Sequence, residues 1–225
     1  MTEEGWPRRC GHFELLSLLG QGGMAEVYLA RFALGPQKGQ LVALKRVRRE
    51  RLRDAEVLAQ VRQEALLTRR MDHPNVVRLV EAGELQDGSY YLALELVEGT
   101  DLGKLLAECR RRRIELPVDI SVYVVRQVLE GLSHAHLATN EAGLPLALVH
   151  CDVSPSNVLL SHEGEVKLSD FGVAWRRGGT TVDVRRLGKG YYRSPELLEG
   201  KVSDAVDLWA TAVMLYELLT RESPF

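Results

Sequence analysis

The spacing of apolar residues changes near residues 95–99, and this change restricts the folds that the chain can adopt. Before it, short apolar runs alternate with turns rich in Gly, Asn and Asp, a pattern typical of β-strands. After it, apolar residues recur at every third or fourth position over long stretches, as in α-helices. A chain of 225 residues with strands first and helices second is expected to form an α+β fold of two lobes.

The first part of the chain predicts five strands and one helix. A Gly-rich turn at residues 20–23 joins the first two strands in a hairpin. The helix is expected to begin after Asp54, its N-cap, and to stop before the turn that contains Pro74. The strands are expected at residues 13–19, 27–32, 41–47, 76–83 and 90–97, and the helix at 54–71.

The second part predicts long helices and a short hairpin. The hairpin turns at Gly164, and its two strands are expected at residues 158–160 and 166–168. The helices are expected at residues 102–113, 117–136 and 204–219. The second of them carries an apolar stripe of Ile120, Val124, Val128 and Leu132.

The composition is that of a soluble globular protein, with 45% apolar residues and a formal net charge of -2. Because 29 Lys and Arg residues balance 31 Asp and Glu residues, no field favours nucleic acid or a membrane as the main partner. Basic runs at residues 45–53 and 110–113 are most simply solvated surfaces. We expect neither a nucleic-acid partner nor a membrane partner.

Cysteine spacing and the N-terminus indicate a cytoplasmic protein. Cys10, Cys109 and Cys151 lack the spacing of a disulfide framework or a zinc site. The N-terminus is acidic and has no apolar segment of the kind that a signal peptide needs. The longest apolar stretch, residues 208–219, is shorter than the roughly 20 residues that cross a bilayer.

The Gly-rich turn is the first candidate for ligand binding. Glycines allow backbone N–H groups to approach a phosphate with no side chain in the way. Such a turn is more often only a turn, so this feature alone leaves both interpretations open.

Lys45 and Glu64 form the second candidate. By itself Lys45 is best explained as an exposed member of its basic run. Glu64, however, lies on the same helix face as Val57 and Val61, so its carboxylate is expected on the core side. A buried carboxylate needs a cation, and Lys45 is the expected partner.

Three polar residues frame the hairpin of the second part. Asp152 and Asn157 precede its first strand, and Asp170 follows its second strand. Because a hairpin brings its two ends together, we expect these side chains to converge on one cleft. They supply the base and the oxygen ligands that Mg-dependent phosphoryl transfer requires. Any one of them could be a loop cap, but the ordered set favours a site.

In order and spacing, these features resemble a protein kinase catalytic domain of the bacterial Ser/Thr type over residues 13–225. The resemblance implies an N-terminal tail (1–12), a small antiparallel β N-lobe with one helix (13–98) and a mainly helical C-lobe (99–225). The matching segments are Leu19-Gly20-Gln21-Gly22-Gly23-Met24-Ala25-Glu26-Val27, Val42-Ala43-Leu44-Lys45, Glu64, residues 150–157, Asp170-Phe171-Gly172 and Ser194-Pro195-Glu196.

The resemblance implies ATP and Mg as cofactors and a protein as substrate. Its roles make Asp152 the base that orients and deprotonates the attacking hydroxyl, with Asn157 and Asp170 as Mg ligands. Lys45, held by Glu64, would contact the α- and β-phosphates of ATP.

The resemblance also implies the nucleotide contacts. Leu94 would guard the back of the adenine pocket, and Glu95 and Val97 would offer backbone hydrogen bonds. Val27, Ala43 and Leu159 would sandwich the adenine. The loop that covers ATP would comprise Leu19, Gly20, Gln21, Gly22, Gly23, Met24, Ala25, Glu26 and Val27.

Cys151 is one departure from the family pattern, because an Arg that receives the phosphate of the activation loop is usual there. A thiol cannot take this role. We therefore expect that phosphorylation of Thr180 or Thr181 does not switch activity on through this contact. Cys151 itself is either packing filler, the favoured interpretation, or a redox switch.

Ser154 is a second departure, because Ser/Thr kinases have a catalytic-loop Lys at this position. Its loss could cost about 10²- to 10³-fold in rate, as for other preorganised donors. Lys189 stands where the family has a Thr that touches this Lys. Either Lys189 replaces the missing cation, as a further catalytic residue, or it is a solvated side chain.

The end of the chain is a third departure, because the family carries more helices after residue 225 than this sequence does. One of those helices supplies an Arg that pairs with the residue equivalent to Glu196, so a buried Glu196 would lack its partner. The C-lobe is therefore expected to be incomplete. It would expose an apolar stripe (Trp209, Val213, Tyr216 and Leu219) or bind a protein partner over it.

Three functions stay open from the sequence. The favoured one is a Ser/Thr protein kinase in bacterial signalling, since all catalytic and metal positions are occupied and Pro155 fits this class. A pseudokinase that serves as a nucleotide-binding scaffold is the alternative, favoured by Cys151 and Ser154. An unstable gene product is the third.

Overall fold

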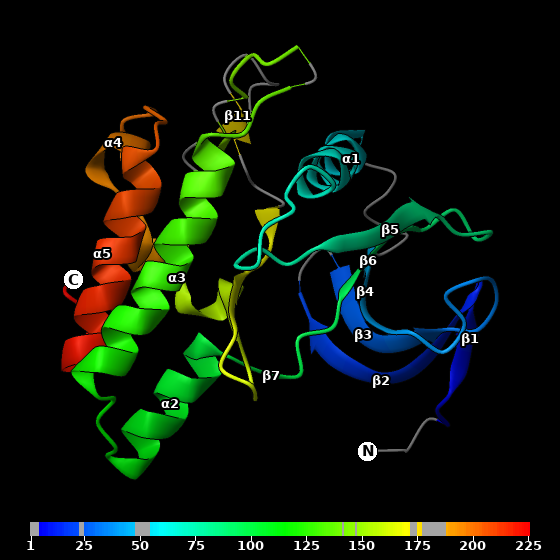
Figure 1. Ribbon diagram of the computed structural model, residues 1–225, viewed down its shortest axis with the longest axis horizontal. Coiled ribbons are helices and arrows are strands. Elements are labelled where there is room, and N and C mark those ends of the chain that lie inside the picture. Colours follow the sequence, from blue (N-terminus) through cyan, green and yellow to red (C-terminus); the bar gives the residue numbers. More distant parts are fainter. Residues whose placement is uncertain are drawn as a thin grey trace. The chain divides into compact units, whose positions relative to one another are not determined.

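The computed structural model describes residues 5–22, 25–47, 55–140, 142–146, 148–171, 175–176 and 188–225 (Figure 1). It consists of two compact units. The first comprises Met1–Arg69 with Arg78–Val97, and the second comprises Arg70–Val77 with Glu98–Phe225. The first is built around a β-sheet and the second is mainly helical, which confirms the predicted α+β fold.

The first unit contains a six-stranded sheet with the order β1-β2-β3-β4-β6-β5, in which neighbouring strands are antiparallel. The predicted Gly-rich hairpin is present as β2 and β3, and the predicted helix is α1, Ala55–Thr68. The expected N-cap Asp54 lies outside the described residues. The strands are β1 (Arg8–Cys10), β2 (Phe13–Gln21), β3 (Ala25–Phe32), β4 (Leu41–Val47), β5 (Leu79–Glu84) and β6 (Tyr90–Glu95).

One strand was predicted to begin three residues earlier than it does in the structure. Residues 76–83 were expected to form it, but β5 begins at Leu79. The reason is that the preceding residues bond to the second unit: the Val77 N–H donates to the Leu168 carbonyl at 2.9 Å, and the Leu168 N–H donates to the Asn75 carbonyl at 2.8 Å. The apolar pair Val76 and Val77 is therefore buried in a different core from the one its sequence neighbours use.

The two faces of the large sheet carry different cores, because side chains alternate along each strand. One face packs Phe13, Phe32 and Leu44 together with Tyr91. The other face packs residues of β3, β4 and β6 against α1, whose Val61 and Ala65 are buried there. Lys45 is on this second face, since it is paired with Val27 across the β3–β4 ladder and with Leu92 of β6.

Four helices form most of the second unit, and α3 and α5 lie side by side in it (Figure 1). The stripe predicted for α3 is buried at Val124, Val128 and Leu132. Ile120, in contrast, is 45% exposed, because Ser121 faces inward in the first turn of α3. The helices are α2 (Leu102–Arg112), α3 (Val118–His136), α4 (Pro195–Leu198) and α5 (Ala205–Thr220).

Short strands complete the second unit. The predicted hairpin is β9 (Val158–Ser161) and β10 (Val166–Leu168), and β7 (Gly99–Asp101), which the sequence did not predict, pairs with β9. A Cβ at Gly99 would lie 1.9 Å from the Leu160 carbonyl oxygen, so this pairing requires glycine. The remaining pair is β8 (Leu148–Val149) with β11 (Trp175–Arg176).

The apolar stripe predicted at the end of the chain is only partly exposed. Val213 is buried, whereas Tyr216 and Leu219 are exposed. The Trp209 ring stacks on Phe225, with 6.0 Å between the ring centroids. Glu196 is exposed, so the cost expected for a buried carboxylate at this position does not arise.

Among the described residues, none of the helices combines the length and the apolar character needed to cross a membrane.

Candidate active site

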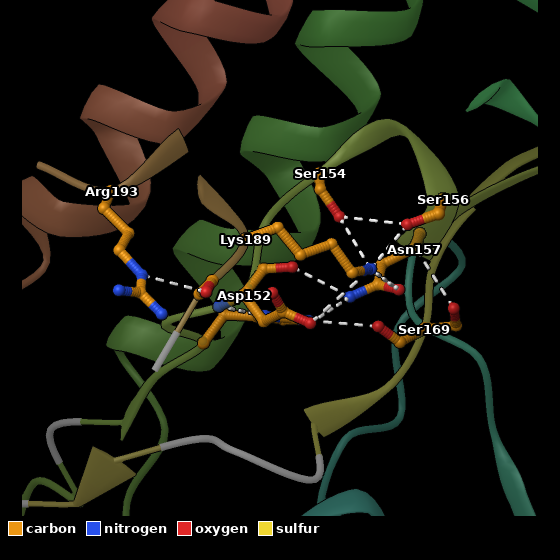
Figure 2. Close-up of polar contacts among 9 residues, drawn as sticks. Asp152, Ser154, Ser156, Asn157, Ser169, Lys189 and Arg193 are labelled. Atoms are coloured by element: carbon orange, nitrogen blue, oxygen red, sulfur yellow. Dashed lines mark hydrogen bonds and ion pairs between the residues drawn. The ribbon is translucent and has the colours of Figure 1, made fainter. Parts of the chain in front are cut away.

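Asp152 and Asn157 lie at the two ends of a closed loop that precedes β9. The Asn157 side-chain amide donates to the Asp152 backbone carbonyl at 2.8 Å and to its carboxylate at 2.9 Å (Figure 2). Residues 155–157 form a 3-10 turn, η2 (Pro155–Asn157), which aims the Asn157 side chain back at Asp152. The predicted convergence of these two side chains is therefore present.

Asp207, in the first turn of α5, forms hydrogen bonds with the backbone of this loop. Its carboxylate is fully buried and accepts the backbone N–H groups of His150 at 2.8 Å and Cys151 at 2.9 Å. His136 Nε2 lies 2.8 Å from the same carboxylate. These bonds keep Cys151 in the left-handed region, with φ +63°, a conformation that costs energy for a residue other than glycine.

His150 connects the loop to Asp170. Its Nδ1 accepts the Asp152 backbone N–H at 3.2 Å, so the ring proton lies on Nε2, which donates to the Ser169 carbonyl at 3.1 Å. The Ser169 N–H in turn donates to the Asn157 carbonyl at 2.8 Å. Asp170, the next residue, is thereby placed beside Asn157. It is exposed and has φ +67°.

The donor chemistry of this region fits Mg. Mg prefers hard oxygen ligands, with one or two from the protein. Asn157 turns its amide nitrogen toward Asp152, which leaves Oδ1 as the ligand atom, and Asp170 offers an exposed carboxylate. Phe171 is buried against the His150 ring, 4.5 Å between centroids, and fixes the chain directly after Asp170. Gly172, the last residue of the motif, lies outside the described residues.

Lys189 reaches the same loop from a different segment. Its ammonium donates to Ser156 Oγ at 2.5 Å, Ser154 Oγ at 3.2 Å and Asn157 Oδ1 at 3.2 Å (Figure 2). It also lies 3.7 Å from the Asp152 carboxylate. Of the two interpretations of Lys189, this geometry favours a residue of the site.

Cys151 is buried in an apolar cluster with Val149, Leu197 and Val206. This environment favours packing filler over a redox switch, because an oxidised sulfur would need polar partners and space. The two threonines of the expected activation segment, Thr180 and Thr181, lie outside the described residues.

In the first unit, Lys45 and Glu64 form the expected ion pair. The Lys45 ammonium lies 2.6 Å from Glu64 Oε1, and the two side chains are 17% and 5% exposed. The pair forms because Lys45 of β4 lies on the sheet face against which α1 packs. The 3.6-residue period of α1 places Glu64 on the same side of the helix as Val61, toward that sheet face.

The Gly-rich turn has an open backbone. The Gly22 N–H donates to the Ala25 carbonyl at 2.8 Å, and a Cβ at Gly20 would meet no atom within 4 Å. Gln21 donates to Glu26 at 3.2 Å across the hairpin, and Leu19 is exposed. This space fits a bound phosphate. Gly23 and Met24 lie outside the described residues.

The residues expected around the adenine are divided between the units. Val27, Ala43 and Leu94 are half-buried on the α1 face of the large sheet, and Leu159 is half-buried in the second unit. The Glu95 N–H donates to the Arg78 carbonyl at 3.0 Å, so Glu95 can offer a ligand only its carbonyl. Val97 is half-buried after the end of β6.

Several residues that shape the site were not predicted from the sequence. Asp207 lies within the helix expected at residues 204–219, but an acidic residue in a first turn is common and does not reveal a role in the site. Ser156 gave no signal. The contact of Glu217 with Tyr192 and Arg110 was not predicted either, because it joins three segments that are far apart in the sequence.

Comparisons with known proteins agree with the geometry. A family model described as the protein kinase domain matches residues 13–225. Tyrosine-protein kinase MasK of Myxococcus xanthus is 36% identical over 219 residues, which are 96% of this chain and 34% of that protein. Serine/threonine-protein kinase PrkC of Bacillus subtilis is 33% identical over 221 residues, 97% of this chain and 32% of that protein.

A third relative is a probable serine/threonine-protein kinase of Streptomyces coelicolor. It is 35% identical over 228 residues, which are 97% of this chain and 32% of that protein. The chain therefore spans about one third of the length of these relatives.

Proposed function

Because this chain belongs to the protein kinase family, we propose that it transfers the γ-phosphoryl group of ATP to a Ser or Thr hydroxyl of a protein. The observation that carries the proposal is the closed loop in which Asn157 holds the Asp152 carboxylate. Family membership supports ATP and Mg as cofactors and a protein as substrate. None of the comparisons favours the pseudokinase alternative.

Asp152 acts as the base for the substrate hydroxyl. Its carboxylate orients the hydroxyl and accepts its proton as the oxygen bonds to the γ-phosphorus and the bond from phosphorus to the departing ADP oxygen breaks. The hydrogen bond from Asn157 fixes one carboxylate oxygen and leaves the other for the substrate.

ATP supplies the phosphoryl group, and Mg neutralises the phosphate charge. Asn157 Oδ1 and the Asp170 carboxylate would hold the metal. Lys45 binds the α- and β-phosphates. Glu64 keeps the Lys45 ammonium in place, so that the nucleotide does not have to order it.

Backbone and apolar groups bind the rest of the nucleotide. The open turn around Gly20 leaves the phosphates room to approach the backbone. Val27, Ala43 and Leu159 contact the adenine, Leu94 limits the depth of its pocket, and the Glu95 carbonyl and Val97 bind its edge. The residues of the covering loop are Leu19, Gly20, Gln21, Gly22, Gly23, Met24, Ala25, Glu26 and Val27.

Ser or Thr is proposed as the acceptor because of the loop sequence around Pro155, which is the first residue of η2. The relatives differ on this point: one is named a tyrosine kinase and two are named serine/threonine kinases. Hydrolysis of the labelled product and separation of phosphoserine, phosphothreonine and phosphotyrosine tests it. Phosphotyrosine as the main product would refute the proposed acceptor class.

The decisive experiment compares wild type with Asp152→Asn in a transfer assay with labelled γ-phosphate and Mg. The variant should lose about 10²- to 10⁴-fold in kcat, the usual range for loss of a general base. Stabilisation of the protein against heat by Mg-ATP should persist. Asp119→Asn is the matched control, because Asp119 is an exposed acidic residue on α3.

Two results would contradict the proposal. One is Mg-ATP binding without any transfer by wild type, which would support the pseudokinase alternative. The other is equal transfer by wild type and Asp152→Asn. The further predictions, a cytoplasmic location and a protein partner over the exposed part of α5, stay predictions.

A further inference from the structure

The ammonium of Lys189 forms its hydrogen bonds with the loop that runs from Asp152 to Asn157. It has three N–H donors, and hydroxyl or amide oxygens of Ser154, Ser156 and Asn157 lie at 3.2, 2.5 and 3.2 Å from it (Figure 2). The Asp152 carboxylate at 3.7 Å adds an ion pair. A solvated Lys does not direct all its donors into a single loop, and ordering this side chain costs rotamer entropy.

The loop supplies no cation of its own that could take this place. Residues 150–157 contain neither Lys nor Arg, and the side chains nearest the ammonium are two neutral serines. Phosphoryl transfer gathers negative charge on the transferred oxygens, and a preorganised cation beside them stabilises it. Lys189 therefore brings to the base and the metal ligand a positive charge from outside the loop.

We propose that Lys189 is a positioning residue for Asp152 and Asn157, and that the seating of residues 188–194 holds its ammonium in place. This inference rests on the proposed function. It assigns to the same site a cation from outside the loop, which reaches Asp152 and Asn157 while this segment is seated.

Contacts with two helices seat the segment. The Tyr192 hydroxyl donates to the Glu217 carboxylate of α5, and Arg110 of α2 pairs with the same carboxylate. Glu217 is buried, so the loss of either partner is costly. Burial and the hydrogen bond to Glu217 raise the pKa of Tyr192, which keeps its hydroxyl protonated as a donor.

Hydrogen bonds within the segment and one close approach to the loop complete the seat. The Arg193 side chain donates to the Gly188 carbonyl at 3.0 Å, and the Tyr192 N–H donates to the Lys189 carbonyl at 2.9 Å, which closes a tight turn. Gly188 has φ +75°, and a Cβ there would lie 2.9 Å from the Cys151 carbonyl oxygen. Because a side chain at residue 188 would not fit, the segment lies directly against the backbone of the loop, and displacing the segment would carry the Lys189 backbone away from the loop.

The first test removes the ammonium and then supplies it from elsewhere. Lys189→Met should lower kcat about 10²-fold, with KM for ATP and the melting temperature little changed. Lys189→Arg should retain part of the activity. Ser154→Lys in the Lys189→Met background should restore at least tenfold, because it returns a cation to the same oxygens. Wild-type kcat in Lys189→Met, or a loss that neither Arg nor Ser154→Lys reduces, overturns the proposal.

The second test uses the protein without nucleotide, so it does not depend on activity. An acylating reagent is applied, and mass spectrometry follows the modification rate of each Lys. Tyr192→Phe should raise the rate at Lys189 several-fold, because the seat is loosened, and leave the rate at Lys104 unchanged. Tyr191→Phe is the matched control, since Tyr191 is exposed beside Tyr192. Equal rates in the two variants overturn the claim that seating of this segment holds the Lys189 ammonium in place.

Kinetics of the double variant complete the test. Tyr192→Phe should lower kcat, but it should have little further effect in the Lys189→Met background, because both changes remove the same interaction. Fully additive effects contradict this coupling. Absence of transfer by wild type overturns the proposed function together with this inference, whereas active wild type with active Lys189→Met overturns the inference alone.

Discussion

The carboxylate of Asp207 accepts the backbone N–H of Cys151 at 2.9 Å, and Cys151 has φ +63°. This contact fixes the loop in front of Asp152 in a conformation that costs of order 1 to 3 kcal/mol for a residue with a side chain. The cost is offset because the same buried carboxylate also accepts the His150 N–H at 2.8 Å. The base is therefore positioned by a residue of α5 that never reaches the substrate.

Asp207→Ala should lower both stability and activity. It leaves the N–H groups of His150 and Cys151 without their acceptor, and each such buried group costs about 1 to 3 kcal/mol. Urea denaturation should show a loss of about 2 to 5 kcal/mol in the free energy of unfolding. Asp204→Ala is the control: it removes only an exposed contact to Ala205 on the same helix and should cost about 1 kcal/mol. Equal losses in the two variants would contradict this role.

The pair Lys45 and Glu64 should be needed for transfer more than for folding. Lys45→Met alone removes the cation beside a carboxylate that is 5% exposed, which should cost about 3 to 5 kcal/mol. Lys45→Met with Glu64→Leu replaces the whole pair by apolar groups and should recover most of that stability. Its transfer rate should still be at least 10²-fold lower than that of the wild type, because the cation proposed to contact the α- and β-phosphates is then absent.

Thermal denaturation and the transfer assay, run side by side, check this prediction. Lys38→Met serves as the control, since Lys38 is exposed in the turn between β3 and β4. Full transfer activity in the refolded double variant would show that Lys45 does not bind the nucleotide phosphates.

Local sequence patterns predicted much of the fold and the part of the site that lies in the first unit. The Gly-rich turn, the limits of β4 and the position of Glu64 on α1 follow from alternation and helical period, which depend on near neighbours. The Lys45–Glu64 contact followed as well, because a charge on a core-facing stripe needs a partner.

Contacts between distant segments were not predictable in this way. Val76 and Val77 look like the start of a strand of the large sheet, yet they pair with residue 168 and belong to the second unit. In the sequence, Gly99 only marks the change of pattern near residues 95–99, whereas in the fold it allows β7 to approach β9. Asp207 is buried because two backbone N–H groups more than fifty positions earlier need an acceptor, and no pattern within α5 reveals that requirement.

Activity should not require phosphorylation of Thr180 or Thr181 through position 151. The Cys151 side chain is buried among Val149, Leu197 and Val206, and it carries no charge with which to bind a phosphate. The double variant Thr180→Ala/Thr181→Ala should therefore keep more than a tenth of the wild-type kcat. Transfer assays on this variant and on wild type, the latter with and without prior phosphatase treatment, measure this. A loss of more than tenfold in the variant would contradict the prediction.

A fall in pH should lower the stability of the second unit, because His73 becomes protonated. Its ring stacks on His134, with 5.0 Å between the centroids, and its Nδ1 accepts the Asn75 N–H at 3.2 Å. Burial, and then the neighbouring His134, lower the pKa of His73 below its ordinary value of 6.5, and Glu130 opposes them only weakly. The unfolded chain therefore binds a proton at this ring more readily than the folded chain does. The stability contributed by the neutral ring is complete above about pH 6.5 and is lost as the pH falls below it.

His73→Asn should make the free energy of unfolding less dependent on pH between 7 and 5, because Asn retains an acceptor for the Asn75 N–H but does not titrate. The change in slope should be well below the roughly 1.4 kcal/mol per pH unit of a full proton difference, since the ring is only half-buried. Urea denaturation at several pH values measures it, with His162→Asn as control because His162 is exposed in the turn between β9 and β10. An unchanged slope in His73→Asn, or the same change in His162→Asn, would show that the stacked pair does not cause the acid sensitivity.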